Sequence, residues 1–362
     1  MMVQAQVKCP HELFQSPIRW NTRGGLSMTG EFSGIAVPVL SMFDESFKIN
    51  KDAQELLVKH VINNGANVLF LNGSTGEGQF LQEHHPHERV TLIQATRAAI
   101  SSMNDSTPVI FGLYGESRDE VVTQYEFILD AIDDAGKTAK VDGFVIAPPL
   151  TRKMNMDELE SYFRSIISQV REPVFLYNNP SKFGRNNIPV SMLDDLLSHF
   201  DHLKGFKDSS PSIEYKMEAI KVILNKDCVN FYTGKEGDFF NCLTGTTVEQ
   251  AKRIGCIPSI GNVLNLPSKI WNSSLKGKEA FARDLQEQLN GIRNKIYHEA
   301  SKPGKAQRGG KIAFSILYRS RVPRYHPVVS PEYEMKLEKT TIDGIRTNLE
   351  LALQEGFMQL VP

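Results

Sequence analysis

The residues best suited to chemistry stand at the ends of two short apolar runs. Residues 174–180 read Val-Phe-Leu-Tyr-Asn-Asn-Pro, and residues 203–210 read Leu-Lys-Gly-Phe-Lys-Asp-Ser-Ser. An apolar run that passes into polar, turn-forming residues is typical of a buried parallel strand that reaches a loop. If these strands are neighbours in a barrel, the phenol of Tyr177 and the amine of Lys207 meet at its carboxyl-terminal mouth.

A lysine enclosed in a barrel can act as a nucleophile. Burial disfavours the charged form of an amine, so we expect the pKa of Lys207 to fall and a neutral amine to become available. The chemistry that follows is a Schiff base with a carbonyl substrate. The alternative is plain: most lysines are solvated surface groups, and a tyrosine such as Tyr177 is more often a packed aromatic. The hypothesis therefore depends on the pair and on its place in the strand order.

Eight strand candidates alternate with helical patterns at intervals of roughly 30 residues, which is the period of a (β/α)₈ barrel. The helical patterns include one capped by Asn50, one that starts at about Pro86, and two with capping boxes, Ser117 with Glu120 and Asn155 with Glu158. The strand candidates are residues 34–40, 67–71, 108–111, 143–147, the two runs above, 229–232 and 256–260. The sequence thus predicts an α/β fold, a (β/α)₈ TIM barrel over residues 33–272.

The remaining segments flank this barrel. Residues 1–32 have little periodicity and are interpreted as an N-terminal extension, whereas residues 273–362 are interpreted as a C-terminal helical region with helices at about 275–300, 312–318 and 342–355. A doubly wound sheet is the rival fold. It usually carries a Gly-rich fingerprint after its first strand, but residues 41–44 here read Ser-Met-Phe-Asp.

Composition narrows the class of protein. The 362 residues carry 41 basic and 42 acidic side chains, a formal charge of −1, which gives no reason to expect a nucleic acid or an anionic membrane as partner. The four cysteines have no zinc-binding spacing, so reduced thiols in a cytoplasm are the simpler interpretation. No stretch has about 18 consecutive apolar residues, and no secretory signal is evident at the N-terminus.

A glycine-rich loop follows the second predicted strand. Residues 72–78 read Asn-Gly-Ser-Thr-Gly-Glu-Gly. Glycines that flank two hydroxyl residues allow backbone amides and hydroxyls to converge on an anion, so Ser74 and Thr75 could hold a carboxylate. An ordinary glycine-rich turn is the alternative. The loop is not a P-loop, because the Gly-Lys-Ser/Thr ending is missing.

Three motifs together resemble the dihydrodipicolinate synthase / N-acetylneuraminate lyase family: Gly73-Ser-Thr-Gly-Glu77, Tyr177-Asn-x-Pro180 and Gly205-x-Lys-Asp208, in the family's order and spacing. The resemblance covers roughly residues 33–270. It implies a class I aldolase in which Lys207 forms the Schiff base, Tyr177 relays the proton, and Ser74 and Thr75 bind the carboxylate of a 2-oxo acid. It also implies that Thr75 touches the tyrosine hydroxyl. Family members commonly form homotetramers and need no metal or organic cofactor.

The sequence departs from the synthase branch of the family at two positions. That branch has a tyrosine after the fourth strand, where this chain has Leu150, and an arginine where this chain has Lys182. Lysine is not equivalent to arginine at a bidentate site, although Lys182 remains a candidate for binding substrate. Both departures argue against lysine biosynthesis, and the run Lys207-Asp-Ser-Ser210 is more similar to the sugar-acid aldolase and dehydratase members. In that comparison Glu236 and Ser259 could contact sugar hydroxyls, and residues 244–253 form a short insertion that either reshapes the pocket or extends a helix.

The function expected from these observations is a lyase that cleaves a 2-oxo-3-deoxy sugar acid, or a related 4-hydroxy-2-oxo acid, to pyruvate and an aldehyde. The expected partners are therefore a small 2-oxo acid and an aldehyde. Three alternatives stay open: a dehydratase acting on a similar sugar acid, a condensation like that of dihydrodipicolinate synthase, and a non-catalytic family member that binds a 2-oxo acid.

Overall fold

The computed structural model describes residues 20–21, 25–26, 32–135, 140–297, 303–333 and 337–361. Most of the predicted N-terminal extension, including Cys9, lies outside these residues. Within it, Trp20–Asn21 (β1) and Gly25–Leu26 (β2) pair antiparallel. Among the described residues, every helix falls short of the length and apolarity that a membrane span requires.

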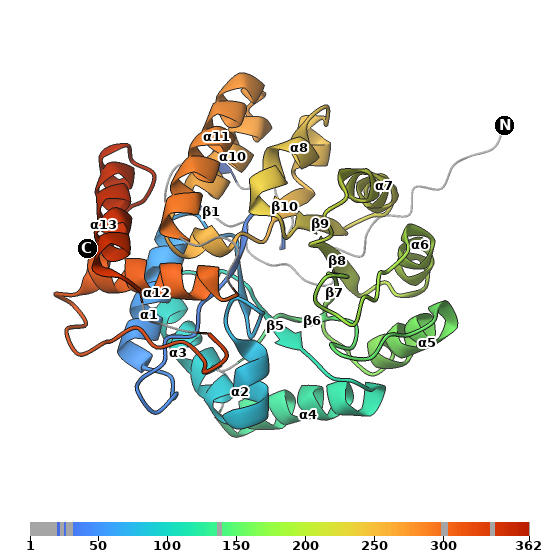
Figure 1. The fold of residues 1–362 in the computed structure, drawn as a ribbon. Helices are drawn as coiled ribbons and strands as arrows, with labels where there is room; N and C mark the ends of the chain where they lie inside the picture. The colour runs from blue at the N-terminus through green and yellow to red at the C-terminus, as the bar shows by residue number, and fades with distance from the viewer. Residues whose placement is uncertain are drawn as a thin grey trace.

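Eight parallel strands form the barrel, which Figure 1 shows surrounded by helices. Their spatial order follows the order of the chain, and a parallel bridge between Ile35 and Cys256 joins the last strand to the first. The fold is therefore the predicted (β/α)₈ barrel with additional C-terminal helices. The strands are β3 (Ala36–Pro38), β4 (Val68–Leu71), β5 (Val109–Leu113), β6 (Gly143–Ile146), β7 (Val174–Asn178), β8 (Leu203–Asp208), β9 (Asn230–Thr233) and β10 (Ile254–Cys256).

Side chains alternate between two hydrophobic clusters along each strand. On β7, Val174 and Leu176 belong to the large cluster between strands and helices, whereas Phe175 and Tyr177 belong to the smaller cluster inside the barrel. Phe32 also lies in the inner cluster, with its ring centroid 5.1 Å from that of Phe175. The barrel is thus a packed core, and only its ends can offer a site.

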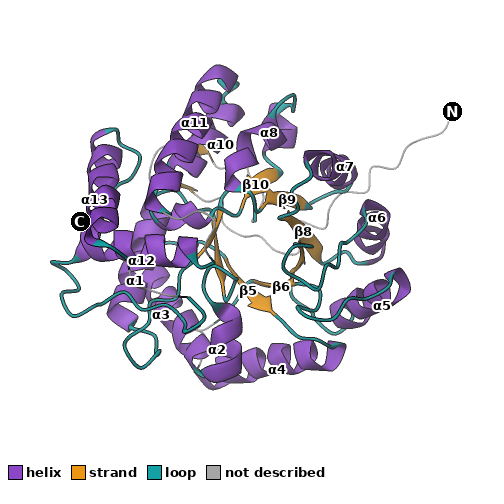
Figure 2. Cartoon of the chain, viewed as in Figure 1, coloured by secondary structure: helices purple, strands orange, loops and turns teal. Residues whose placement is uncertain are grey.

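The helices of the barrel form the outer layer seen in Figure 2. Asn50 caps α1 by accepting a hydrogen bond from the Ala53 amide, and Asn155 with Glu158 forms the predicted capping box of α5. The helices are α1 (Lys51–Asn63), α2 (Gly78–His84), α3 (Glu88–Ser102), α4 (Arg118–Ala135), α5 (Met156–Ile167), α6 (Val190–His199), α7 (Ile213–Leu224), α8 (Phe239–Leu243), α9 (Val248–Ala251) and α10 (Leu266–Leu275).

Two predicted boundaries are wrong for local reasons. The eighth strand was expected at residues 256–260, but β10 ends at Cys256 and the chain turns into a 3₁₀ helix, η3 (Ser259–Asn262). Pro258, which precedes it, has no amide hydrogen to donate to a strand ladder. Pro86 was expected in the first turn of a helix, but α3 begins at Glu88 after the N-cap residue His87. Helix α2 was missed.

Two finer predictions also need correction. Ser117 accepts a hydrogen bond from the Glu120 amide, at 3.3 Å, but the Glu120 carboxylate accepts from the Glu116 amide rather than from Ser117 itself. The second hydrogen bond of the capping box therefore comes from the amide of Glu116, one residue before Ser117. The insertion at residues 244–253 forms its own short helix, α9, capped by Thr247 and Gln250, and leads into the start of β10. It neither extends α8 nor lies at the end of β10 where the mouth is.

Three further helices follow the barrel: α11 (Glu279–Ile296), α12 (Lys305–Tyr318) and α13 (Lys339–Gln354). Helix α11 begins four residues later than expected. Helix α12 begins seven residues earlier than expected, because close packing accommodates its glycines within the helix. A Cβ at Gly309 would lie 2.4 Å from the Ile296 carbonyl oxygen, and one at Gly310 would lie 2.7 Å from the Leu40 side chain. Helix α12 therefore packs directly against the barrel, at the left in Figure 1.

Candidate active site

The strand register brings Lys207 and Tyr177 together at the carboxyl ends of β7 and β8. The two residues are directly paired in the parallel ladder, and the Lys207 Nζ lies 3.7 Å from the centroid of the Tyr177 ring. It also lies 5.1 Å from the Phe70 ring centroid. Both side chains are buried, with 6% of Lys207 and 3% of Tyr177 exposed. The amine of Lys207 and the phenol of Tyr177 therefore lie next to each other, as expected.

Burial and mutual charge set the protonation of the pair. Burial lowers the pKa of the Lys207 amine, and the nearby Tyr177 opposes this shift only in part. Burial also raises the pKa of Tyr177, but Lys207, Ser209 and Asn179 outweigh it, and the net result lowers the pKa to about 8. The Asn179 amide donates a hydrogen bond to the Tyr177 hydroxyl at 3.2 Å. Both pKa values are therefore lowered from their ordinary values, which favours a neutral amine at Lys207 and a phenolate at Tyr177.

A buried polar network fixes the ends of these two strands, and the sequence did not indicate it. Asn178 donates to the Asp208 carboxylate at 2.8 Å, and the Ser210 hydroxyl donates to the same carboxylate at 2.7 Å. Lys216 lies 3.8 Å from that carboxylate and donates to the Ser210 carbonyl. Because Asn178 and Asp208 directly follow Tyr177 and Lys207, this network holds the reactive pair in register.

Gly205 makes room beneath the lysine. A Cβ at this position would lie 2.3 Å from the Phe175 ring, which fills the inside of the barrel there. Any larger residue two positions before Lys207 would therefore displace the Phe175 ring inside the barrel. This steric requirement explains the glycine in the Gly-x-Lys-Asp motif.

The glycine-rich loop after β4 lies at the same mouth, but the hydrogen-bond partner of Thr75 is Ser259 rather than Tyr177. The Thr75 hydroxyl lies 2.8 Å from the Ser259 hydroxyl on η3. Ser74 has a buried hydroxyl with no hydrogen-bond partner among the described residues. The loop is held from below by Ser41, which donates to the Gly76 carbonyl at 2.6 Å.

Lys182 lies at the edge of the same site. It lines a small hollow together with Ser74, Gln79 and Tyr114. Its charge contributes to lowering the pKa of both Tyr177 and Lys207, although in each case after larger causes. A cation in this place can attract the anionic part of a substrate.

Glu236 is buried in a 3₁₀ helix, η2 (Glu236–Asp238), after β9. Its carboxylate accepts a hydrogen bond from the Ile260 amide at 3.1 Å, and it lies beside Tyr297 and Arg293 of the C-terminal region. Burial raises the pKa of Glu236 despite the nearby Arg293. Its contacts join the loops after β9 and β10, which places Ser259 opposite Thr75.

The C-terminal helical region completes the mouth, a contribution that the sequence did not indicate. Gln307 on α12 donates to the Ser74 carbonyl at 2.9 Å. Lys311, on the same helix, forms a fully buried ion pair with Glu77 at 2.5 Å. The second carboxylate oxygen of Glu77 accepts from the Ser330 amide. We call residues 328–333, which follow α12 and reach the hollow through Glu332 and Tyr333, the C-terminal strap.

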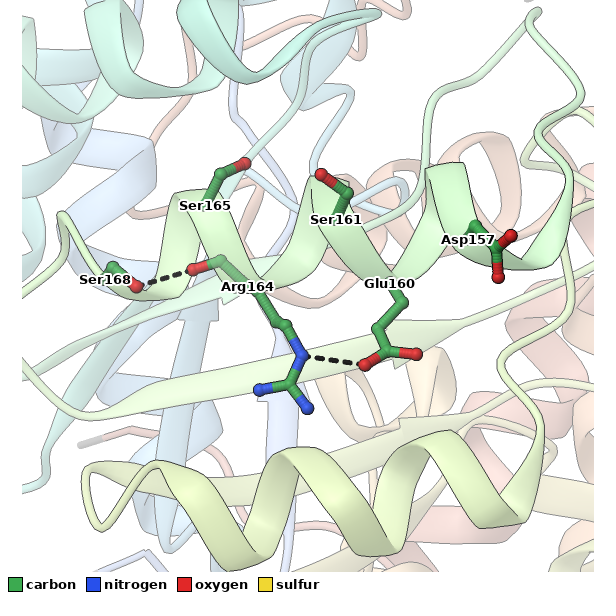
Figure 3. Close-up of a pocket in the computed structure, with 6 residues that line it drawn as sticks. All are labelled: Asp157, Glu160, Ser161, Arg164, Ser165 and Ser168. Carbon is green, nitrogen blue, oxygen red and sulfur yellow. Dashed lines mark hydrogen bonds and ion pairs between the residues drawn. The ribbon is translucent and has the colours of Figure 1, made fainter.

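A separate and more open hollow lies on the outside of α5, far from the strand ends. Figure 3 shows its six residues on one helix, with Arg164 bonded to Glu160. The Arg164 Nε and the Glu160 Oε1 are 2.7 Å apart, and Arg164 also forms an ion pair with Asp195 of α6. Its one cation, Arg164, is engaged by two carboxylates, so the hollow offers no catalytic arrangement. Within the described residues, no group of three or more His, Cys, Asp or Glu side chains is placed to hold a metal ion.

The match to a known family decides what kind of protein this is. The family model described as the dihydrodipicolinate synthetase family matches residues 31–339, which include the entire barrel and α12. The chain belongs to this family. A relative, 4-hydroxy-tetrahydrodipicolinate synthase from Oceanobacillus iheyensis, is 27% identical over 208 residues, which are 57% of this chain. The chain spans 60% and 63% of the lengths of two of the curated relatives it matches.

Solved structures of the dihydrodipicolinate synthetase family share the fold. YagE, a prophage protein of the family from E. coli K12 that was solved in complex with pyruvate, has a TM-score of 0.73 and 21% identity, covering 91% of this chain and all of that one. The 2-keto 3-deoxygluconate aldolase from Picrophilus torridus has a TM-score of 0.67 and 21% identity, covering 85% of this chain and 99% of that one.

Proposed function

We propose that this protein is a Schiff-base lyase that cleaves a 4-hydroxy-2-oxo acid, such as a 2-oxo-3-deoxy sugar acid, to pyruvate and an aldehyde. The observation that carries the proposal is the buried amine of Lys207, 3.7 Å from the Tyr177 ring centroid at the mouth of the barrel. Family membership supports it, and so does the shared fold of the Picrophilus torridus aldolase.

The reaction begins at Lys207. Its neutral amine adds to the C2 carbonyl of the substrate, and the Tyr177 phenol gives a proton to the resulting hydroxyl, which leaves as water and yields the protonated imine and the Tyr177 phenolate. This iminium is a cation in the place of the ammonium group, so it favours the phenolate form of Tyr177 for the same electrostatic reason. The carboxylate of the substrate would face the loop of Ser74 and Thr75.

Cleavage then uses Tyr177 as the base. Its phenolate takes the proton of the C4 hydroxyl, the C3–C4 bond breaks, and its electron pair forms an enamine as the iminium is neutralised. The aldehyde leaves. Protonation of C3 by the Tyr177 phenol restores the iminium, and water hydrolyses it to pyruvate and neutral Lys207 while the Tyr177 phenolate takes up the released proton. The water released at the first step is consumed at the last, so the protein ends unchanged.

The choice of substrate is supported by the loops. The loop after β6 carries Leu150 rather than a tyrosine, and the Glu116 carboxylate binds the Leu150 and Thr151 amides, both at 3.0 Å. At Lys182 a single ammonium replaces the bidentate guanidinium of the synthase branch. Both features disfavour condensation of pyruvate with aspartate semialdehyde, so we expect that turnover to be negligible.

The proposal extends to assembly and surroundings. We propose a homotetramer in the cytoplasm that takes a small 2-oxo acid and an aldehyde as its ligands and works through the covalent Schiff base without an added cofactor. Light scattering of the purified protein at micromolar concentration measures the assembly. Activity that survives exhaustive chelation is the expected result.

The deciding experiment combines trapping with product detection. Pyruvate and borohydride should give a reduced adduct on Lys207, found by mass spectrometry of a digest. A panel of 4-hydroxy-2-oxo acids should yield pyruvate in a coupled assay. An adduct on another lysine would contradict the assigned nucleophile. Loss of the keto acid without pyruvate would instead identify a dehydratase, and robust synthase turnover would overturn the choice of substrate.

A further inference from the structure

Tyr114 places a second phenol at the mouth of the barrel, directly after β5. Its ring is stacked with that of Phe183, with centroids 6.3 Å apart and an angle of 27° between the planes. Phe183 in turn meets the Tyr177 ring edge to face at 5.0 Å. Gln82 donates to the Tyr114 carbonyl at 2.9 Å and fixes the backbone. The two phenols therefore flank one aromatic ring on the same side of the site.

The Tyr114 hydroxyl is turned toward the strand ends. A Cβ added at Gly112 would lie 3.0 Å from the Tyr114 oxygen, so the side chain folds back over its own strand. Burial raises the pKa of Tyr114, Tyr177 raises it further, and Ser74 opposes the shift. The phenol therefore lies close to both residues, and its proton stays in place throughout the working range of pH.

The buried hydroxyls of Tyr114 and Ser74 lie close enough to interact with each other, but neither makes a well-formed hydrogen bond to any described residue. Most buried polar groups in folded proteins are paired, and leaving one unpaired is destabilising. These two groups line the same hollow as Lys182, and Tyr114 is close enough to Tyr177 for the two phenols to interact electrostatically. The ring stacking on Phe183 would be equally well served by a phenylalanine, so packing does not explain the hydroxyl. A partner that arrives with the substrate does.

We propose that Tyr114 is a catalytic residue whose hydroxyl donates a hydrogen bond to the C4 oxygen of the substrate, with Ser74 linking it to Tyr177. The inference rests on the proposed lyase function. In condensation the Tyr114 hydroxyl polarises the aldehyde carbonyl while Tyr177 delivers the proton. In cleavage the same hydrogen bond stabilises the negative charge that develops on this oxygen as Tyr177 removes its proton. Tyr114 itself neither gains nor loses a proton.

The role of Tyr114 also bears on whether one subunit carries all the groups that the reaction needs. The loop after β6, which carries Leu150, offers no phenol. Tyr114 comes from the neighbouring strand, β5, and reaches the hollow through a side chain of the same chain. One subunit thus supplies amine, proton carrier and carbonyl-polarising group without a side chain from another copy.

The test is Tyr114→Phe, with Tyr125→Phe as the matched control. Tyr125 is another largely buried phenol and lies on α4. Its hydroxyl donates to Glu172 at 2.8 Å, just before β7 and therefore at the opposite end of the barrel. We expect Tyr114→Phe to lower the rate of pyruvate condensation with glyceraldehyde by about 10²-fold. Exchange of the pyruvate methyl protons with deuterated water should change little, because pyruvate has no C4 oxygen. Tyr125→Phe should leave both rates unchanged.

The outcomes separate this inference from the function on which it rests. A wild-type protein that forms no borohydride adduct with pyruvate would sink the lyase proposal, and Tyr114 with it. A wild-type adduct together with condensation by Tyr114→Phe within twofold of wild type overturns the role of Tyr114 alone. Equal losses of condensation and methyl exchange would also overturn it, because they mark a damaged site.

Discussion

The two sides of the barrel mouth are built in different ways. On one side, Tyr177 and Lys207 end adjacent strands, and their alignment follows from the register of a parallel ladder. On the other side, Thr75 and Ser259 come from loops 184 residues apart in sequence and meet through one hydrogen bond. The first side is enclosed by aromatic rings, whereas the second consists of hydroxyl and backbone groups.

This difference separates reactivity from adaptability. The side with the amine depends on the barrel itself, so its geometry can change only if the strands move. The side with the hydroxyls is carried by the Ser74 loop and η3 and supported by α12, so it can be altered without disturbing the strands. We infer that the first side fixes the Schiff-base chemistry and the second selects the acid.

The largest effect is expected at the strand side. Lys207→Ala should abolish both the borohydride adduct and turnover, since no other amine lies in its place. The variant should stay folded, because it removes a buried amine that functional sites retain at some cost in stability. Mass spectrometry and circular dichroism check both points. Lys204→Ala, on the same strand, is the control and should still form the adduct; an adduct in Lys207→Ala would place the nucleophile elsewhere.

Tyr177→Phe should lower turnover by roughly 10²–10⁴-fold, the range typical of a general acid or base. The adduct with pyruvate should survive because Lys207 is present. The cleavage rate of the wild type should rise with pH around the Tyr177 pKa of about 8, since only the phenolate accepts the C4 proton. That rise should be absent in Tyr177→Phe. Wild-type turnover in the variant would reduce Tyr177 to a packed aromatic.

A third change tests the support of the hydroxyl side. Glu77→Gln leaves the Lys311 cation buried without its partner, and such a loss typically costs 3–5 kcal/mol, so we expect about that decrease in the free energy of unfolding. Adding Lys311→Met should recover part of it. Urea denaturation measures both. Asp343→Asn, in a pair with Arg346 that is 49% exposed on each side, is the control and should cost far less. Equal stability of single and double variants would contradict this account.

The smallest effect is expected at Ser259. Ser259→Ala removes the partner of the Thr75 hydroxyl, and a hydrogen bond of this kind contributes about 0.5–1.5 kcal/mol. We therefore expect KM for the preferred acid to rise by roughly 2–12-fold, with kcat nearly unchanged. Steady-state kinetics on the panel of acids measures this, and Ser259→Thr, which keeps a hydroxyl, should restore the affinity. A kcat that falls with KM unchanged would move Ser259 to the reactive side.

The strand side could be predicted because its determinants are local. Alternation of apolar residues predicts which side chains point inward, and the order of the strands places Tyr177 beside Lys207. The same reasoning placed the end of the last strand wrongly, since Pro258 allows a bend as readily as a strand end, and it missed α2, whose first residue follows Glu77 in a left-handed backbone conformation.

The hydroxyl side could not be predicted in detail. A pattern within a short window cannot show that Thr75 bonds Ser259 rather than the tyrosine, nor that Gln307 and Lys311 reach the loop. These contacts depend on how α12 packs against the barrel, which in turn needs Gly309 and Gly310 to allow close approach. The orientation of Tyr114 has a similar origin in Gly112 and Phe183.

The ion pair between Glu77 and Lys311 can form only late in the synthesis of the chain. Its partners are 234 residues apart, and Ser330, which binds the same carboxylate, is 253 residues beyond Glu77. Chains are made from the N-terminus at about 5–20 residues per second, so the Glu77 carboxylate must wait roughly 12–50 seconds for its counter-ion. Only after β10 (Ile254–Cys256) has been made can the barrel close, so in the last part of that wait it holds its amine and phenol but not a finished binding loop. We therefore expect substrate recognition to depend on the part of the chain that is synthesised last.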